Sequence, residues 1–503
     1  MNQPNQKKKQ QDAPSSRESK ENKLQALIEA GLEAYPHKFE RKDMAGALQD
    51  KYAELEDGGE TEDMVTIAGR IYAMRNNGMF IDLRDTSGKI QVFCHKDRSP
   101  EDELEKLKMF DIGDIIGVTG KVRRTPRGEL SVSAQELTML SKSLLPLPEK
   151  YHGLSDIEQR YRQRYLDLIV NEESRETLRA RSRIVSNIRR QMEERGALEV
   201  ETPMLHGIMG GATAKPFTTH HNALDTDFYL RVAPELHLKR LIVGGLADAV
   251  YEINRCFRNE GISIKHNPEF TTIEGYHAYM DYFDVMDMVE EIVCNVVEEL
   301  HGSLKIKFGP EGEEKEIDFT RPWKRASMID LVKEQTGEDF LSHEDASSAA
   351  AAAKKLGVHT DANANWGQIV EAVFEEKAEH LLMNPTHVLD HPMDISPLAK
   401  THRDNPRLVE RFETFCNGWE IANAFTELND PKVQRERFEA QVAAREAGDD
   451  EAQMLDEDYV EALEYGLPPC GGWGMGIDRL TMLLTNSSNI RDVICFPTLK
   501  PKK

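Results

Sequence analysis

Two alternating runs of residues, joined by a turn-rich loop, constrain the fold of this chain more than any other feature. Tyr251 to Glu260 and Phe270 to Ala278 each alternate as strands do, and Gly261, Asn267 and Pro268 lie in the loop between them. This arrangement predicts an antiparallel hairpin in the middle of the sequence.

The predicted hairpin carries charge on one face. Strand side chains point alternately to opposite sides, so one face of the first strand holds Glu252, Asn254, Arg258 and Glu260, and a face of the second holds Phe270, Glu274 and Tyr276. A fixed cation beside carboxylates and aromatics indicates a site for a polyanion and a cationic ligand together. The alternative is a solvated sheet face with ordinary cross-strand ion pairs.

A glycine-rich segment near the end of the chain also points to a ligand. Residues 471–476 contain four glycines and run into an apolar helix expected over Leu480 to Leu484, with Arg479 at the junction. Strand glycines usually mark the close approach of a ligand or another backbone. The planar guanidinium beside them is suited to a phosphate. A glycine-rich bulge with a surface arginine is the alternative.

Both segments resemble signature motifs of the class II aminoacyl-tRNA synthetases. Phe257-Arg258-Asn259-Glu260-Gly261, with His266-Asn267-Pro268-Glu269-Phe270, is similar to motif 2, and residues 471–480 are similar to motif 3. The resemblance implies an α+β fold with an antiparallel catalytic sheet and two catalytic arginines. Arg258 would span the amino acid carboxylate and the ATP α-phosphate, and Arg479 would hold the γ-phosphate. Residues 196–203 resemble motif 1, which implies a homodimer.

Composition limits the class of protein. A chain of 503 residues is long for one core and predicts two or three domains. No apolar run approaches the length of a membrane span, and the polar N-terminus is unlike a signal peptide. The six cysteines are far apart without a C-x-x-C pair, which favours reduced thiols over disulfides or zinc. We therefore expect a soluble, cytoplasmic protein that does not interact with membranes.

The net charge of −24 argues against a nucleic-acid partner until its distribution is examined. Residues 65–150 hold 14 Lys and Arg against 12 Asp and Glu, and residues 1–42 hold 9 against 6. The N-terminal part is therefore neutral to basic, which permits RNA binding there. The tail with Lys7-Lys8-Lys9 is expected to be disordered, and it serves either as a solubilising arm or to gather RNA.

Short β-like runs fill residues 65–147 and predict a small barrel of the OB type, a fold that commonly binds single-stranded nucleic acid. The expected strands are Val65–Arg70, Met79–Arg84, Lys89–His95, Asp114–Val122 and Glu129–Ser133. The segment resembles the anticodon-binding barrel of the class IIb synthetases (aspartyl, asparaginyl and lysyl), which implies tRNA as a partner. The positions carried over as anticodon-binding are Arg70, Phe80, Gln91 and Glu129. Without the resemblance, Phe80 reads as a barrel-core aromatic.

We predict three parts along the chain: an N-terminal tail and helical extension over 1–60, the barrel over 61–147, and a catalytic domain over 148–503. A helix is expected from about Glu21 to Ala34, and a linker with Pro146 and Pro148 follows the barrel. Helices are expected from Ile157 to Glu194. An alanine-rich helix, Ala346 to Leu356, reads as part of a helical insertion.

Three carboxylates in the predicted catalytic domain indicate a cationic substrate. They are Glu235, Glu274 and Glu427, and on a strand Asn423 and Phe425 point the same way as Glu427. A buried carboxylate is costly unless paired. Several around one cavity therefore indicate a cationic ligand or shifted pKa values. Lysine, with two ammonium groups, fits this demand, whereas aspartate would be repelled.

The resemblance gives the same substrate, since A-P-E-L followed by Leu-Lys-Arg, and E-I-x-N-x-F-x-E-L-N-D, are patterns of lysyl-tRNA synthetases of the bacterial type. It implies Mg²⁺ at the acidic pair Glu413 and Glu420, although strand parity places Glu420 opposite to Glu427. It implies lysine binding by Gly211, Glu235, Arg258, Glu274, Tyr276, Asn423 and Glu427. It implies ATP binding by Arg258, Glu260, His266, Asn267, Phe270 and Arg479.

The activity implied is ATP-dependent attachment of L-lysine to tRNA(Lys) through lysyl-adenylate. The alternatives are an aspartyl or asparaginyl ligase of the same subclass, a lysyl-adenylate enzyme that modifies a protein, and a non-catalytic RNA-binding paralogue. Three departures from the pattern concern pocket shape: an extra residue within Gly245–Tyr251, Trp419 where arginine is usual, and Trp473 where a smaller aliphatic residue is usual.

Overall fold

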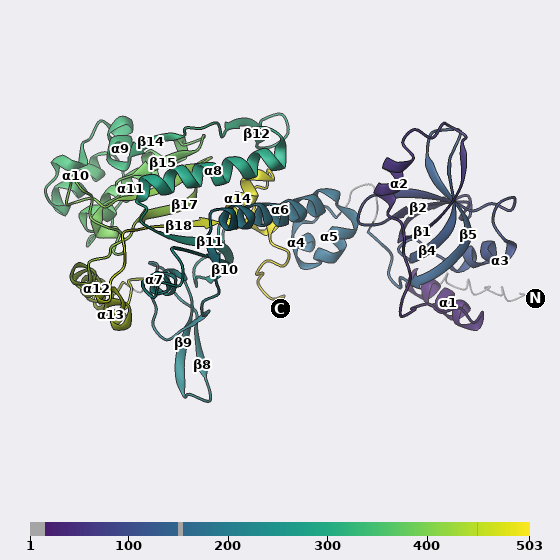
Figure 1. Ribbon diagram of the computed structural model, residues 1–503, viewed down its shortest axis with the longest axis horizontal. Helices are drawn as coiled ribbons and strands as arrows, with labels where there is room; N and C mark the ends of the chain where they lie inside the picture. Colours follow the sequence, from purple (N-terminus) through teal and green to yellow (C-terminus); the bar gives the residue numbers. More distant parts are fainter. Residues whose placement is uncertain (1–15, 149–153, 450, 503) are drawn as a thin grey trace, which may run out of the picture. The chain divides into compact units, whose positions relative to one another are not determined.

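The computed structural model describes residues 16–148, 154–449 and 451–502, which form two compact units, Met1–Gly153 and Leu154–Lys503 (Figure 1). The predicted basic tail with Lys7-Lys8-Lys9 lies outside the described residues. No helix among the residues described is long and apolar enough to cross a membrane.

The first unit is a closed five-stranded barrel in the order β1-β2-β3-β5-β4. Its interior is filled by fully buried aliphatic residues that alternate along the strands, such as Val65 and Ile67, or Val92 and Ile90. Where β4 crosses β5, a Cβ at Gly120 would lie 2.0 Å from the Ser133 carbonyl oxygen, so only glycine allows this approach. The elements are α1 (Ser16–Glu29), α2 (Ala45–Lys51), β1 (Glu60–Arg75), β2 (Phe80–Arg84), β3 (Lys89–Phe93), α3 (Glu101–Lys106), η1 (Leu107–Met109), β4 (Ile115–Arg124) and β5 (Leu130–Ser141).

All five predicted barrel strands are present, and β1 and β5 are longer than predicted. The predicted helix Glu21–Ala34 is wrong at its end, since α1 stops at Glu29. Gly31 has φ +71°, a left-handed conformation that terminates helices. The amide of Leu32 then donates to the carbonyl of Leu27 and closes the turn.

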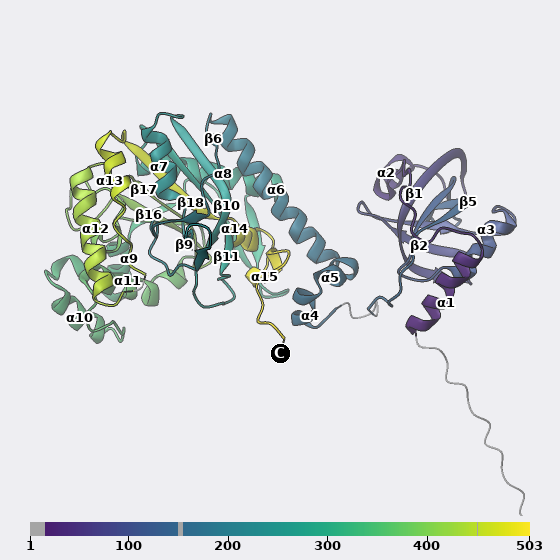
Figure 2. The same cartoon turned by 90° about the horizontal axis from the view of Figure 1, so that it is seen from below.

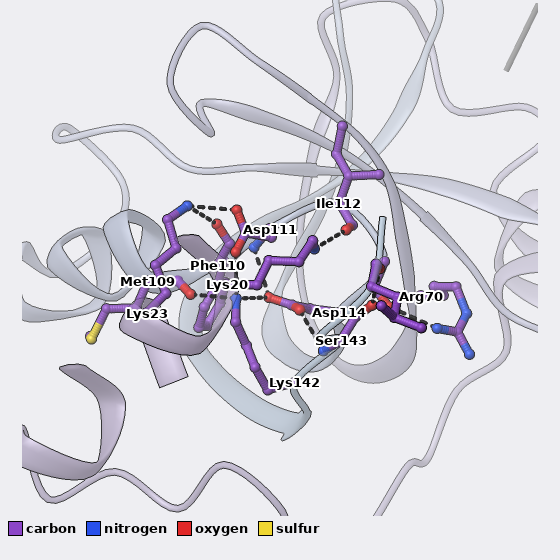
Figure 3. Close-up of polar contacts among 12 residues, drawn as sticks. Lys20, Lys23, Arg70, Met109, Phe110, Asp111, Ile112, Asp114, Lys142 and Ser143 are labelled. Carbon is purple, nitrogen blue, oxygen red and sulfur yellow. Dashed lines mark hydrogen bonds and ion pairs between the residues drawn. The ribbon is translucent and has the colours of Figure 1, made fainter. Parts of the chain in front are cut away.

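Lysine ammonium groups attach α1 to the barrel around two aspartates (Figure 3). The side chains of Lys142 and Asp114 are fully buried, and Lys142 Nζ lies 2.8 Å from Asp114 Oδ2 and 2.7 Å from Asp111 Oδ2. From α1, Lys23 donates to Asp111 Oδ1 at 2.6 Å and Lys20 donates to the carbonyl of Ile112 at 2.9 Å. Burial is the largest influence on Lys20 and lowers the pKa of its ammonium. The helix is therefore held by a partly exposed ion pair of Lys23 and by the hydrogen bond of Lys20, next to the fully buried Lys142–Asp114 pair of the barrel.

Lys142→Met should lower the free energy of unfolding of the barrel unit by about 3 kcal/mol, because it leaves Asp114 buried without its cation. All four tryptophans of the chain, Trp323, Trp366, Trp419 and Trp473, lie in the second unit. Far-UV circular dichroism should therefore show an earlier transition in urea, while the tryptophan fluorescence transition stays in place.

Lys108→Met is the matched control, because it removes an exposed lysine paired with Glu105 and should cost less than about 0.5 kcal/mol. Equal stability of the Lys142 and Lys108 variants would contradict the role given to the buried pair.

The second unit is built on an eight-stranded sheet in the order β14-β15-β16-β17-β18-β11-β10-β6. Its pairs are antiparallel except at the two edges, where β14 pairs with β15 and β6 with β10 in parallel. The strands are β6 (Leu198–Glu199), β10 (Ala249–Phe257), β11 (Glu269–Ala278), β14 (Lys324–Ser327), β15 (Thr386–Leu389), β16 (Arg411–Cys416), β17 (Trp419–Thr426) and β18 (Cys470–Gly476). The predicted hairpin is confirmed as β10 and β11, with Glu252 directly opposite Glu274. Its first strand is shorter than predicted, since β10 ends at Phe257 and leaves Arg258 and Glu260 beyond the strand.

Helices cover both faces of this sheet (Figure 2). On one face α8 (Tyr282–His301) packs on β17 and β18, with α6 (Glu172–Glu194) beside it and α14 (Ile477–Leu484) behind motif 3. On the other, α7 (Glu235–Val243) packs on β10 and β11, with α13 (Glu457–Glu464) and α12 (Pro431–Glu446) outside it. Buried residues of α8, such as Val289, join Ile273 and Ala422 in the largest core.

The remaining elements surround the catalytic sheet. The predicted helices before motif 1 are confirmed as α4 (Ile157–Arg162), α5 (Arg164–Val170) and α6. The insertion is helical as predicted and has a core of its own around Phe340 and Phe374. It contains α9 (Met328–Thr336), η2 (Phe340–Ser342), α10 (Ala346–Lys355), α11 (Trp366–Lys377) and η3 (Glu379–Leu381). Smaller elements are β7 (Leu205–His206), β8 (Thr218–His221), β9 (Thr226–Leu230), β12 (Lys305–Phe308), β13 (Lys315–Asp318), η4 (Met393–Ile395) and α15 (Ile490–Val493).

Candidate active site

A pocket opens on the sheet face that β11, β17 and β18 share. Even-numbered residues of β11 line it, while Ile273 points into the core on the opposite side. The residues predicted to bind ligands that line this pocket are Gly211, Glu235, Arg258, Glu260, His266, Asn267, Phe270, Glu274, Tyr276, Glu420, Asn423 and Arg479. Two predicted site residues, Glu413 and Glu427, are not part of its lining.

Arg258 brings an incompletely paired guanidinium to the pocket. Its backbone amide donates to the carbonyl of Pro268, which places it just beyond the end of β10. Its guanidinium carbon lies 5.2 Å from the centroid of the Phe270 ring. Its Nε is buried and has no hydrogen-bond partner among the residues described. A buried donor without a partner is unfavourable, so this geometry is suited to an anionic ligand.

Arg479 also lines the pocket, on the first turn of α14. Its Nη1 donates to Glu420 Oε2 and to the Glu420 carbonyl, each at 2.9 Å, and its Nη2 lies 3.1 Å from Nε2 of His266. Burial and then the neighbouring Arg479 lower the pKa of His266. The imidazole is therefore neutral at pH 7 and can accept from the guanidinium.

A β-bulge explains how Glu420 reaches the pocket, although regular strand alternation would place it on the face opposite to Asn423 and Phe425. Thr414 on β16 pairs with Ala422, but Phe415 pairs with Glu420, so Ile421 is an extra residue on β17. Its side chain, like those of Ala422 and Ala424, lies in the core. The extra residue shifts the alternation by one, so Glu420 shares the pocket face with Asn423 and Phe425. The break in regular pleating thus removes the conflict between strand parity and the predicted place of Glu420 at the site.

Carboxylates gather at the α7 side of the pocket. Glu274 accepts from the Tyr276 hydroxyl at 3.1 Å, and burial followed by the charge of Glu235 raises the pKa of Glu274 to about 8. Lys239, one turn after Glu235 on α7, donates to Glu235 Oε1 at 2.6 Å. Sequence reasoning did not identify Lys239 as a member of this carboxylate cluster. Its spacing of four from Glu235 on a helix was the available signal.

Glu427 lies behind the pocket rather than on its surface. It is fully buried, and its Oε2 forms an ion pair with Lys239. It lies near Tyr276, because a Cβ added at Gly472 would come within 2.6 Å of the Tyr276 ring and would overlap Glu427 Oε1. The absence of a side chain at Gly472 thus allows a carboxylate and a phenol to lie side by side.

Glu413 and Glu420 lie among further acidic residues. Glu413 is opposite Asn423 and accepts from Arg411 Nη2 at 2.5 Å, and Arg411 Nε donates to Asn423 at 3.1 Å. Burial is the largest influence that raises the pKa of Glu371 on α11 to about 7; Arg411 opposes the rise, and Glu413, Glu375 and Glu420 add to it. The described ranges contain no group of three or more His, Cys, Asp or Glu positioned to hold a metal ion.

The remaining ligand-binding candidates are fixed by backbone geometry. Gly211 has φ +92°, and its amide donates to Gln453 Oε1 at 3.2 Å. Asn267 is buried and donates to the carbonyl of Glu269, while its Oδ1 has no hydrogen-bond partner among the described residues. Asp478 accepts from the Thr271 amide at 2.7 Å and joins the start of α14 to β11.

On the barrel, the structure brings three of the four predicted anticodon residues to one region. Gln91 on β3 accepts from the Ser131 hydroxyl at 2.9 Å, and Glu129 lies 3.2 Å from Lys89, which precedes Gln91 by two residues. Phe80 stacks near Phe93, with ring centroids 5.2 Å apart. The fourth residue, Arg70, lies at the other end of β2, opposite Arg84, and donates to the Gly113 carbonyl.

The position opposite Phe80 is instead occupied by Arg75, which sequence reasoning missed. Arg75 forms two hydrogen bonds with Asp82, at 2.9 and 2.8 Å. A register count from the Asn76-Asn77-Gly78 turn could have found it, because the turn fixes which residues face each other.

The two tryptophans noted in the sequence do not narrow the pocket. Trp473 is 2% exposed and packs in the core, where Gly275 leaves room for its indole. Trp419 packs edge-on against Phe308, with Lys265 over its ring. The Trp473 indole thus packs in the core, although Trp473 is among the residues that line the pocket, and Trp419 is not part of the lining.

Comparison with known protein families shows to which class of proteins the chain belongs. Residues 156–500 match the family described as tRNA synthetases class II (D, K and N), and residues 65–140 match OB-fold nucleic acid binding domains. The chain therefore belongs to the class II tRNA synthetases of this group. The predicted α+β fold, with an antiparallel catalytic sheet and an N-terminal OB-type barrel, is confirmed.

The most similar curated proteins specify the relationship further. The chain is 54% identical to the lysine–tRNA ligase of Sinorhizobium medicae over 95% of its own length and 96% of that protein. It is 54% identical to the lysine–tRNA ligase of Rhizobium meliloti, over 96% and 97%. It is 53% identical to that of Carboxydothermus hydrogenoformans, over 95% and 97%.

Replacement of Glu274 by Gln should stabilise the protein increasingly as pH rises from 5.5 to 8.5. A carboxyl whose pKa is raised to about 8 in the fold retains its proton where the unfolded chain has lost it, so its contribution to stability falls over this range. The thermal midpoint of Glu274→Gln should therefore exceed that of the wild type by more at pH 8.5 than at pH 5.5.

The control is Glu299→Gln. Arg190 lowers the pKa of Glu299, so this variant should lose stability equally at both pH values. Parallel curves for Glu274→Gln and the wild type would contradict a raised pKa at this position.

Proposed function

We propose that the protein is a lysine–tRNA ligase that uses ATP to form lysyl-adenylate and then transfers lysine to tRNA(Lys). The observation that carries the proposal is the pocket itself. The pocket is lined by Arg258, whose guanidinium is incompletely paired, and by carboxylates that outnumber the cations paired with them. This arrangement is complementary to an amino acid with one carboxylate and two ammonium groups. Relatives over 50% identical are named lysine–tRNA ligases, which supports the same substrate.

Lysine would bind along the sheet with its carboxylate toward Arg258 and Asn423. Its α-ammonium would contact Glu235 and the backbone of Gly211. Its ε-ammonium would enter the space bounded by Glu274 and Tyr276, with Glu427 behind. A neutral or anionic competitor would leave these buried carboxylates without a cation, so the pocket itself supplies the discrimination.

ATP would occupy the other end of the pocket. The adenine would stack on Phe270, beside His266, Asn267 and Glu260, and Arg479 would hold the γ-phosphate. The lysine carboxylate oxygen attacks the α-phosphorus in line, and pyrophosphate leaves with the broken P–O bond. The residues act by positioning and charge stabilisation, which is what such transfers require. The 3′-terminal ribose hydroxyl of the tRNA then attacks the adenylate carbonyl and releases AMP.

Glu413 and Glu420 would hold Mg²⁺. Their hard oxygen ligands suit this ion, which commonly uses one or two carboxylates together with substrate phosphates. The pair lies close to a further carboxyl, because Glu413 and Glu420 add to the effect of burial in raising the pKa of Glu371, and a cation would relieve this part of the rise. When bound, the ion would neutralise phosphate charge. Arg479 would then exchange Glu420 for phosphate oxygens.

The barrel would bind the anticodon of tRNA(Lys). Phe80 would stack on a base and Gln91 and Glu129 would contact base edges. We assign the neighbouring cation to Arg75, which faces Phe80, whereas Arg70 is engaged with the Gly113 carbonyl. We also propose the division of the chain into an N-terminal extension over 1–60, an anticodon-binding barrel over 61–147 and a catalytic domain over 148–503.

We infer a homodimer and a cytoplasmic location. Exposed apolar side chains on and after β6, at Leu198, Leu205 and Ile208, support a dimer surface beside the segment that resembles motif 1. Attachment of amino acids to tRNA belongs to translation, which supports the location. The match along residues 156–500 and the pocket arginines disfavour a non-catalytic RNA-binding paralogue.

The wild-type protein should catalyse ATP–pyrophosphate exchange with lysine, without tRNA, and not with aspartate or asparagine. Ornithine should support weaker exchange, since its shorter side chain cannot reach the same carboxylates. Arg258→Ala should lower the rate by about 100-fold or more, because it removes charge stabilisation at the α-phosphate. Exchange driven by aspartate would overturn the substrate assignment, and no exchange would favour the RNA-binding alternative.

Gln91→Ala and Arg75→Ala should weaken aminoacylation of tRNA(Lys) by about tenfold each while leaving lysine-dependent exchange unchanged, since both lie in the barrel. Arg70→Ala is the control and should affect charging less than Arg75→Ala. An equal loss in exchange and charging would mean that the barrel does not bind the anticodon.

A further inference from the structure

A buried lysine of the protein's own chain lies inside the carboxylate cluster. The side chain of Lys239 is fully buried, and its ammonium contacts Glu235 and Glu427 together. It lies 5.8 Å from the Tyr276 ring centroid, 5.4 Å from that of Phe425 and 5.9 Å from that of Tyr459. No other buried lysine of the described catalytic unit is paired in this way. None of the roles proposed above uses it.

Glu427 is only half engaged by this lysine. Its Oε2 meets the Lys239 ammonium, whereas its Oε1 is buried without a hydrogen-bond partner in the part of the chain that the structure describes. A buried carboxylate oxygen without a donor costs free energy that a cationic ligand would recover. Gly472 leaves the space beside Oε1 free of any side chain of its own.

Counting charges at this end of the pocket gives a definite balance. The carboxylates are Glu235, Glu274 and Glu427, and Lys239 is their one internal cation. Of the nearby arginines, Arg231 is paired with Glu252 and Arg411 with Glu413, and Arg258 is the one assigned above to the substrate carboxylate. A bound cation favours the ionised form of each carboxyl, and with all four groups ionised the cluster carries two uncompensated negative charges. L-lysine brings two ammonium groups.

We propose that Lys239 is a positioning and specificity-determining residue that holds one oxygen of Glu427 and sets the charge of the cluster to match a diammonium amino acid. The inference rests on the proposed function and extends it to a residue that does not line the pocket. Lys239 acts through Glu427 and Glu235 and does not contact the reacting atoms. It neutralises one carboxylate charge and fixes the orientation of the two it bridges.

The test is lysine-dependent ATP–pyrophosphate exchange by full-length Lys239→Met, Glu427→Gln and the double variant, which leave three, one and two net negative charges in the cluster. Each single substitution should raise KM for lysine by about tenfold or more, with kcat changed far less, because each unbalances a buried charge pair. The double variant should have a KM about fivefold or more below that of Glu427→Gln, because it restores the balance. Additive losses would overturn the proposal.

The double variant also controls for a folding defect. It removes both members of the Lys239–Glu427 ion pair and therefore buries neither charge without the other. If Lys239→Met does not fold, a lower KM of the double variant than of Glu427→Gln still supports the proposal, and an equal or higher KM still overturns it. Lys400→Met is the control, since Lys400 lies in the same unit and donates to Asn429 rather than to a carboxylate. Its KM for lysine should equal that of the wild type.

The outcome separates this inference from the proposed function. Wild-type protein that shows no exchange with lysine refutes the proposed function, and this inference with it. If the wild-type protein is active with lysine and the effects of the two substitutions on KM are additive, only the role of Lys239 is refuted.

Discussion

The catalytic unit depends on a cluster of buried carboxylates that outnumber the cations available within the fold to neutralise them. Glu235 lies on α7, Glu274 on β11 and Glu427 directly after β17, and only Lys239 compensates them from within. Burying such groups costs free energy that the surrounding core must supply. The sheet, with α8 packed on its other face, provides the rigid framework that keeps these charges together. A cationic ligand thus completes an electrostatic arrangement that the protein leaves unfinished.

Much of this architecture could be predicted from the sequence, because the signals were local. The alternation in β10 and β11, the turn between them and the glycines of β18 each depend on neighbours within a few residues. The predicted barrel strands were right in number and in their places along the chain for the same reason. The end of α1 was predicted wrongly, although Gly31 was a local signal for it.

Features that depend on the register of distant residues could not be read from the sequence. Ile421 adds a residue to β17, and this alone brings Glu420 to the pocket face. Arg75 faces Phe80 and Arg70 faces Arg84, a register that the string Ala68-Gly69-Arg70 does not contain. The pairing of Lys239 with Glu427 joins positions 188 residues apart in the numbering, so no local pattern contains it. Only its contact with Glu235, on the same helix face, had a local signal.

The bulge at Ile421 has a consequence for how this protein can change. Most core positions tolerate a swap of similar volume, because the backbone path is unaffected. Deletion of the extra residue would restore regular pleating and turn Glu420 toward the core, away from Arg479, while Asn423 kept its place. The number of residues in β17 therefore determines on which face Glu420 lies, and no single side chain does so. Insertions and deletions in this strand should be eliminated by selection far more strictly than substitutions.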